Sequence, residues 1–131
     1  FKKFGRNYSL KGGVRMFDKS DERQWIKIKN AEQILRLWAE IRQIPFYRME
    51  FVTGESMYIG LGVYIFYKTN QELKHYTKNG VLEQTKQKFM GILKEIGYIE
   101  EFNDNVNFSF DSDEHVQKNY KGNYGLRLKD D

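Results

Sequence analysis

The chain has 131 residues, no cysteine and a net charge of +4 at pH 7. This length suits one domain with a core of its own, and the absence of cysteine excludes disulfides and thiolate metal sites. Twenty-one residues are Phe, Tyr or Trp and only two are His, so the chain is rich in contact-making side chains and poor in reactive ones. No apolar run reaches the roughly 18 residues that a membrane-spanning helix needs, and no basic-then-apolar leader opens the chain. These features favour a binding protein over an enzyme.

The charge is unevenly distributed along the chain. Residues 1–50 carry a net +6, residues 51–99 a net +2 and residues 100–131 a net −4. A basic front can attract nucleic acid, anionic lipid or an acidic protein surface. The simpler interpretation is a mixed, solvated surface, because this excess of cations is mild.

The first third of the chain predicts short strands followed by a helix. Residues 1–13 are basic, contain glycine and lack periodicity, so we expect either a flexible start or an edge-like start with a short strand. Strand-like segments follow at residues 14–17 and 25–29. Asn30 is a good N-cap for the next helix, and Pro45 ends it. The expected apolar stripe of this helix consists of Ile34, Leu35, Trp38 and Ile41.

A β-hairpin is predicted in the middle of the chain. Residues 47–53 and 57–67 are strand-like and are separated by a Gly-Glu-Ser turn. The second strand is apolar on both faces, which is typical of a central strand. Gly60 and Gly62 within it indicate a bulge or a close approach of another backbone.

Two helices are expected next. Thr69 and Glu72 fit a capping box at the start of a short helix that ends at Asn79-Gly80. A longer helix follows over residues 81–96; the alternative is one long helix interrupted at Asn79-Gly80. The apolar face of the longer helix would consist of Leu82, Thr85, Phe89, Ile92, Leu93 and Ile96.

The last segments predict strand, helix and strand. Residues 105–110 alternate cleanly and indicate a half-buried strand. Asp111 would cap a short helix with Glu114 at its third position, and residues 124–128 would form a final strand. The whole chain, residues 1–131, is thus predicted to be a single α+β domain. It would have a mostly antiparallel sheet of five or six strands and two main helices packed on it through Leu35, Trp38, Phe89 and Leu93.

Few residues suggest catalysis or metal binding. The acidic run Asp111, Asp113 and Glu114 lacks the glycine and the distant glutamate of a calcium loop, so a capped helix is the favoured interpretation. His75 and His115 are the only imidazoles. Ser112 and Asp111 are close to His115 in the sequence, but adjacent residues at a helix start rarely converge on one site, so both histidines are interpreted as surface or boundary residues. We therefore expect no catalytic residue, no metal site and no cofactor.

Basic and aromatic residues alternate at the start of the chain, in the Phe-Lys-Lys-Phe-Gly-Arg-Asn-Tyr sequence of residues 1–8. This texture is typical of surfaces that contact nucleic acid. Arg42, Tyr47, Arg48 and Lys68 repeat it more weakly. A nucleic-acid-associated protein is therefore the alternative function, with an ordinary basic terminus as the simpler interpretation.

Residues 105–128, Asn-Val-Asn-Phe-Ser-Phe-Asp-Ser-Asp-Glu-His-Val-Gln-Lys-Asn-Tyr-Lys-Gly-Asn-Tyr-Gly-Leu-Arg-Leu, resemble the ends of small bacterial immunity proteins from toxin–immunity loci, including those of contact-dependent inhibition. The resemblance implies a cytoplasmic protein that neutralises a cognate toxin by direct binding. Inhibitors of nuclease toxins are often acidic, whereas this chain is basic overall, so only its tail can complement a basic toxin. The expected partner-binding residues are Asp111, Asp113 and Glu114, with Tyr120 and Tyr124 as aromatic anchors.

Overall fold

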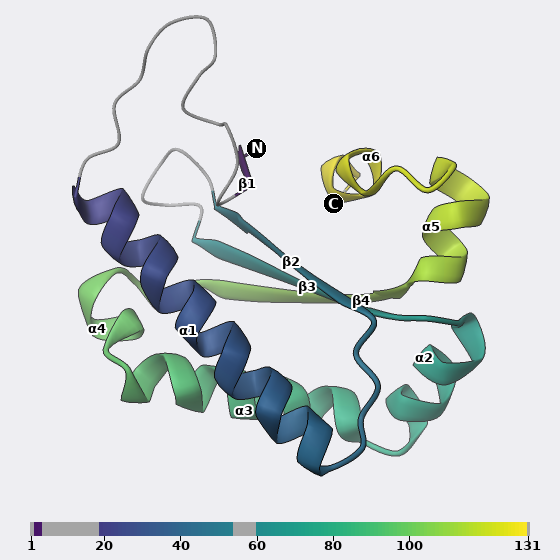
Figure 1. Ribbon diagram of the computed structural model, residues 1–131, viewed down its shortest axis with the longest axis horizontal. Coiled ribbons are helices and arrows are strands. Elements are labelled where there is room, and N and C mark those ends of the chain that lie inside the picture. The colour runs from purple at the N-terminus through teal and green to yellow at the C-terminus, as the bar shows by residue number, and fades with distance from the viewer. Residues whose placement is uncertain (1, 4–18, 54–59, 131) are drawn as a thin grey trace, which may run out of the picture.

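A mixed β-sheet lies between two layers of helices (Figure 1). The computed structural model describes residues 2–3, 19–53 and 60–130. Strands β2 (Arg48–Thr53), β3 (Leu61–Tyr67) and β4 (Val106–Ser112) form the sheet, and the two-residue β1 (Lys2–Lys3) pairs with the end of β2. β3 is central: it runs antiparallel to β2 and parallel to β4.

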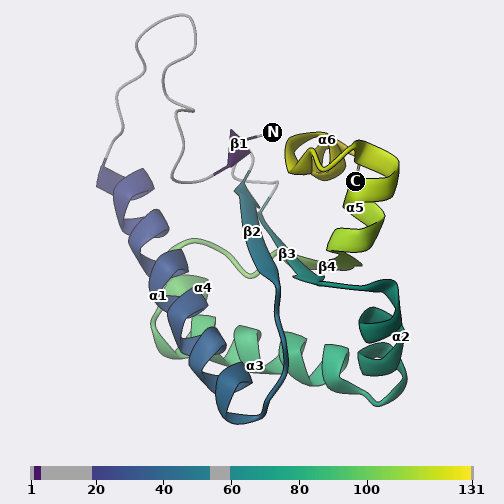
Figure 2. The ribbon, with the colours of Figure 1, turned by 45° about the vertical axis from the view of Figure 1, so that its right-hand side comes forward.

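One face of the sheet is covered by α1 (Lys19–Ile41), α3 (Val81–Glu95) and α4 (Tyr98–Glu101) (Figure 2). Burial of apolar side chains between these helices and the sheet is the main source of stability here. Phe51 and Phe89 stack across the interface with their ring centroids 5.9 Å apart. The main core consists of Ile28, Ala31, Leu35, Met49, Phe51, Leu61, Val63, Ile65, Phe89, Ile92, Leu93 and Tyr98.

The other face is covered at one end by α5 (Asp113–Tyr120) and α6 (Tyr124–Lys129). Phe66 of β3 forms a small core there together with Val116 of α5 and with Tyr124 and Leu128 of α6. A third cluster, around Tyr67, joins the end of α1 to α2 (Asn70–Lys78) and to the start of α3. The chain is therefore an α+β domain, and no described helix is both long and apolar enough to span a membrane.

The first helix begins much earlier than predicted. Residues 25–29 belong to α1, which starts at Lys19, so the predicted strand and the Asn30 cap are both wrong. A five-residue alternation suggested a strand, but the buried positions over residues 28–39 recur every three or four residues, the period of a helix. Of the predicted stripe, Leu35 is buried and Trp38 half-buried, whereas Ile34 and Ile41 are 41% and 83% exposed.

The predicted hairpin and the following helices are confirmed. β2 and β3 pair antiparallel, and residues 54–59 between them lie outside the described part. The Thr69 hydroxyl accepts from the Glu72 amide at 3.0 Å, and α2 and α3 are separate helices joined through Gly80. A Cβ on Gly60 would lie 2.1 Å from the Asn105 carbonyl oxygen, so the expected close backbone approach is confirmed there.

The sheet is smaller than the predicted five or six strands. Residues 124–128 are helical, in α6, because the Asn123 side chain caps the backbone amide of Leu126. The expected strand at residues 14–17 lies outside the described residues. β4 is confirmed as a half-buried strand, but it runs parallel to β3. The three helices α2, α3 and α4 lie between these strands in the chain, and they return it to the end of the sheet at which β3 begins. The N-cap of α5 is Ser112, one residue after the predicted Asp111.

Candidate functional site

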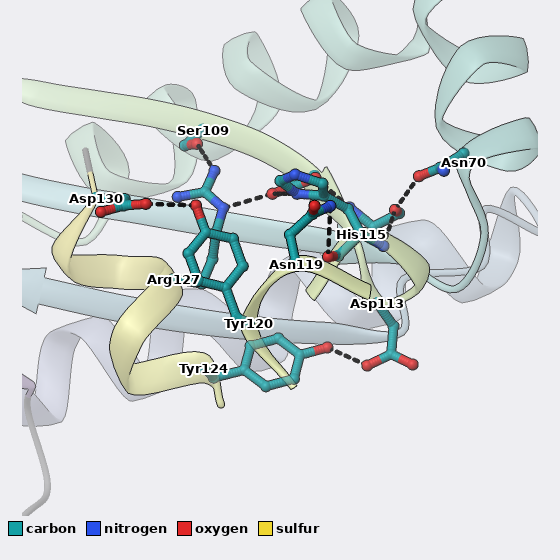
Figure 3. A network of polar contacts seen from close by, with 11 residues as sticks. Asn70, Ser109, Asp113, His115, Asn119, Tyr120, Tyr124, Arg127 and Asp130 are labelled. Carbon is teal, nitrogen blue, oxygen red and sulfur yellow. Dashed lines mark hydrogen bonds and ion pairs between the residues drawn. The ribbon is translucent and has the colours of Figure 1, made fainter. Parts of the chain in front are cut away.

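A network of polar side chains joins β4, α5, α6 and the start of α2 (Figure 3). Asp111, near the end of β4, is its centre and is only 8% exposed. Its Oδ2 accepts from Arg127 Nε at 2.5 Å and from His115 Nδ1 at 2.9 Å. Its Oδ1 accepts from the Ser112 amide at 2.8 Å. The carboxylate is therefore bound from three elements of the chain.

The charge of Asp111 is stabilised inside the protein. Burial raises the pKa of this carboxyl, but the hydrogen bonds from Arg127, His115 and the Ser112 amide outweigh burial and hold the pKa below its ordinary value. Arg127 is equally buried, and its Nη2 lies 3.4 Å from Ser109 Oγ. The pair thus fastens α6 to β4 with a paired rather than an isolated buried charge.

The starts of α2 and α5 hold one another. Ser112 Oγ accepts from the His115 amide at 3.0 Å, as an N-cap does, and also bonds to Asn70 Oδ1. Glu114 Oε1 accepts from the Asn70 amide at 2.9 Å, and the Glu114 amide donates to the Lys68 carbonyl at 3.1 Å. Glu114 is exposed, yet its carboxylate is fixed by this contact.

Asp113 is fixed by α6. Its Oδ1 accepts from the Tyr124 hydroxyl at 2.5 Å and from Gln117 Nε2 at 3.2 Å. Tyr124 is 6% exposed and lies between the Phe66 ring, 4.8 Å away by centroid, and the Arg48 guanidinium, 3.8 Å from its own ring centroid. Burial and the bond to Asp113 raise the pKa of Tyr124, so its hydroxyl remains a donor at neutral pH.

The five residues predicted to bind a partner all lie at this end of the molecule, but in different surroundings. Asp111 and Tyr124 are buried, Asp113 and Tyr120 are half-buried, and Glu114 is exposed. The Tyr120 hydroxyl donates to Asp130 Oδ2 at 2.6 Å. Sequence reasoning missed Arg127 and Asn70, because neither side chain carries a local motif that points to its distant partner.

An open depression lies between the starts of α2 and α5. Asp113 and Glu114 form part of its wall. The remaining residues that line it are Lys68, Thr69, Gln117 and Lys118. This is a surface with fixed carboxylates and adjacent ammonium groups, which suits polar recognition.

Asp111 orients the imidazole ring of His115, as a carboxylate does in some catalytic sites. To act as a base, His115 would also need a nucleophile within hydrogen-bond reach. The hydroxyl of Ser112 bonds instead to the His115 amide and to Asn70. His75 is exposed and contacts the edge of Tyr76 and the side chain of Asn79. Within the described part of the chain, no three His, Cys, Asp or Glu side chains converge as a metal site would require.

The basic and aromatic residues proposed for nucleic-acid contact are only partly described. Residues 1 and 4–8 lie outside the described part. Arg42 lies over the Trp38 ring at 5.2 Å, and Lys68 over the Tyr47 ring at 5.8 Å. These cations therefore make aromatic contacts within the fold.

Comparisons of the chain with models of protein families, with curated proteins and with solved structures found no match.

Proposed function

We propose that this chain is a non-enzymatic protein-binding module, an immunity-type inhibitor that neutralises a cognate bacterial toxin by direct binding. The observation that carries the proposal is the pair of fixed carboxylates of Asp113 and Glu114, which line one open depression. The resemblance of residues 105–128 to immunity proteins supports the same function.

Fixed carboxylates suit recognition of a basic partner. Each carboxylate has about four acceptor positions, so Asp113 and Glu114 keep free lone pairs after their internal bonds. Because their side chains are already ordered, little conformational entropy is lost when a lysine or arginine binds them. Lys68 and Lys118 on the same wall would repel a uniformly basic surface, which gives the site selectivity.

Within this proposal, some of the five predicted residues contact the partner and the others hold those contact residues in place. Asp113, Glu114 and the half-buried Tyr120 are the contact residues. Tyr124 supports them by holding Asp113, and Asp111 supports them by fastening α6, the helix that carries Tyr124, through Arg127.

The test removes charge without removing hydrogen bonds. In a double variant, Asp113→Asn and Glu114→Gln, the amide oxygens can still accept from Tyr124 and Asn70. Under this proposal, we expect a toxin gene immediately upstream. For the toxin domain of that gene, we expect the affinity of the double variant, measured by titration calorimetry, to fall by roughly tenfold or more and to depend less on salt.

A matched control is Glu95→Gln, which removes one exposed charge from the end of α3. The control should bind as the wild type does, and all three proteins should melt at similar temperatures. Wild-type affinity in the double variant would contradict the assignment of the site. Failure of the wild-type chain to bind the toxin domain would contradict the proposed function itself.

A further inference from the structure

The outer face of α1 is apolar although no described element covers it. Four of the six large apolar side chains that are exposed in the described part of the chain lie on this helix. They are Ile26 at 54%, Ile34 at 41%, Leu37 at 60% and Ile41 at 83% exposure. At 3.6 residues per turn their directions fall within roughly 80° of one another, on the side away from the core residues Ile28, Ala31 and Leu35.

These four apolar side chains form what we call the outer stripe of α1, and no charged residue lies at its centre. Asn30 and Gln33, both exposed, complete it, and the charged residues between Ile26 and Ile41 lie on its flanks. In Figure 2, α1 runs along the outer edge of the molecule, on the side away from α5 and α6. An apolar, uncharged stripe on a long helix is typical of a helix–helix interface.

We propose that the outer stripe of α1 binds the same stripe of a second copy of this chain, with the two helices antiparallel. A two-fold axis between Gln33 and Ile34 superposes the pattern on itself. It brings Ile26 of each copy opposite Ile41 of the other, and Gln33 opposite Ile34. Such self-complementarity is what a two-fold interface requires. Asn30 comes opposite Leu37, and a polar residue in such a seam fixes the register at a cost in stability.

The charges on one flank of the stripe agree with this arrangement. In an antiparallel two-fold pair each flank of the helix meets the same flank of the other copy. Lys29 and Arg36 both bind Glu32, at 2.9 and 3.0 Å, so this trio carries one net positive charge. Glu40 is exposed and forms no ion pair within the described part of the chain. The pairing places it close to Lys29 of the second copy, where its charge offsets that of the trio.

The size of the stripe predicts a weak, reversible dimer. From Ile26 to Ile41 the helix rises by roughly 22 Å. A single pair of helices of this length buries less than the roughly 800 Å² per partner of a standard stable interface. We therefore expect a monomer–dimer equilibrium that becomes visible only at high protein concentration.

Sedimentation equilibrium over roughly 10 μM to 1 mM protein tests the association. The mass should rise toward that of a dimer in the wild type. Leu37→Glu should lower the association constant by at least about tenfold, because it buries a charge at the seam. The control Gln71→Glu adds the same charge on the exposed surface of α2 and should leave the association unchanged. Because Leu37 is exposed in the monomer, both variants should keep the wild-type melting temperature.

Cross-linking tests the register, and the cysteine-free chain makes this simple. Gln33→Cys lies beside the two-fold axis and should form a dimer with a short bismaleimide. Ile26→Cys alone should not, because its counterpart lies roughly 22 Å away along the pair, but a mixture of Ile26→Cys and Ile41→Cys should. A wild-type mass that stays monomeric throughout would overturn the proposal, as would self-cross-linking of Ile26→Cys as efficient as that of Gln33→Cys.

Discussion

Replacing Arg127 with Met should destabilise the protein strongly at neutral pH. The change keeps most of the apolar stem but removes the guanidinium 2.5 Å from Asp111. Asp111 would then be a buried carboxylate whose remaining donors are His115 and the Ser112 amide. Removing one partner of a buried ion pair typically costs about 3–5 kcal/mol. For a chain of this length, that corresponds to a fall in melting temperature of roughly 10–20 °C.

The contribution of Asp111 to the stability of this variant should change with pH in the opposite sense from its contribution in the wild type. In the wild type the folded-state pKa of Asp111 is lowered, so its contribution is complete above the ordinary value of 3.8 and is lost as the pH falls through the lower folded-state pKa. In Arg127→Met, fewer hydrogen bonds offset the burial of the Asp111 carboxylate. Protonation of Asp111 therefore removes the free-energy cost of its buried charge. The difference in stability between the two proteins should therefore narrow between pH 7 and pH 3.

Thermal denaturation followed by circular dichroism, at both pH values, measures this difference. Arg23→Met is the matched control, because Arg23 is 54% exposed and its ion pair with Glu101 lies at the surface. It should change the melting temperature little. The double variant Asp111→Asn with Arg127→Met should recover part of the loss. The reasoning would be refuted if Arg127→Met melted within a degree or two of the wild type, or if the difference did not change with pH.

Four further substitutions are tested by urea denaturation. Tyr67→Phe should raise stability by about 1 kcal/mol, because the Tyr67 hydroxyl is buried and no described residue bonds to it; a loss would show that the hydroxyl has a partner. Gly60→Ala should prevent the normal β3–β4 approach, since a Cβ would strike the Asn105 carbonyl, whereas Gly91→Ala, on an open side of α3, should stabilise by about 0.5–1 kcal/mol. Ser112→Ala should cost about 1 kcal/mol through loss of the α5 cap, and unchanged stability would argue against that cap.

The elements that could be predicted from sequence are those whose signals are local. The hairpin of β2 and β3 follows from two apolar strands with a turn signal between them. The start of α2 follows from Thr69 and Glu72, which lie three residues apart and bond as a capping pair. The break at Gly80 follows from a residue that takes a positive φ of 84° without strain. Each inference needs only neighbours in the chain.

The errors arose where short patterns fit two structures. Residues 25–29 alternate like a strand, but Ile28 is buried together with Ala31 and Leu35, so the helical period over a longer window decides the structure. In the same way Leu126, Arg127 and Leu128 alternate within α6, where Leu126 is 51% exposed and the other two are buried. A buried arginine next to an exposed leucine reverses the pattern expected of a surface strand. Burial of Arg127 depends on Asp111, sixteen residues earlier, and no local rule joins the two.

The acidic tail shows why the charge of a segment does not give the charge of a surface. Residues 100–131 carry a net −4, but Glu101 is paired with Arg23 and Lys27, and Asp111 with Arg127. Two of these three cations come from α1 and lie outside the tail. What the fold leaves for an incoming partner is set by which carboxylates remain accessible, and of the acidic run those are Asp113 and Glu114. The tail can therefore be structural at Asp111 and a binding surface two residues later, because β4 ends at Ser112 and α5 turns the following side chains toward α2.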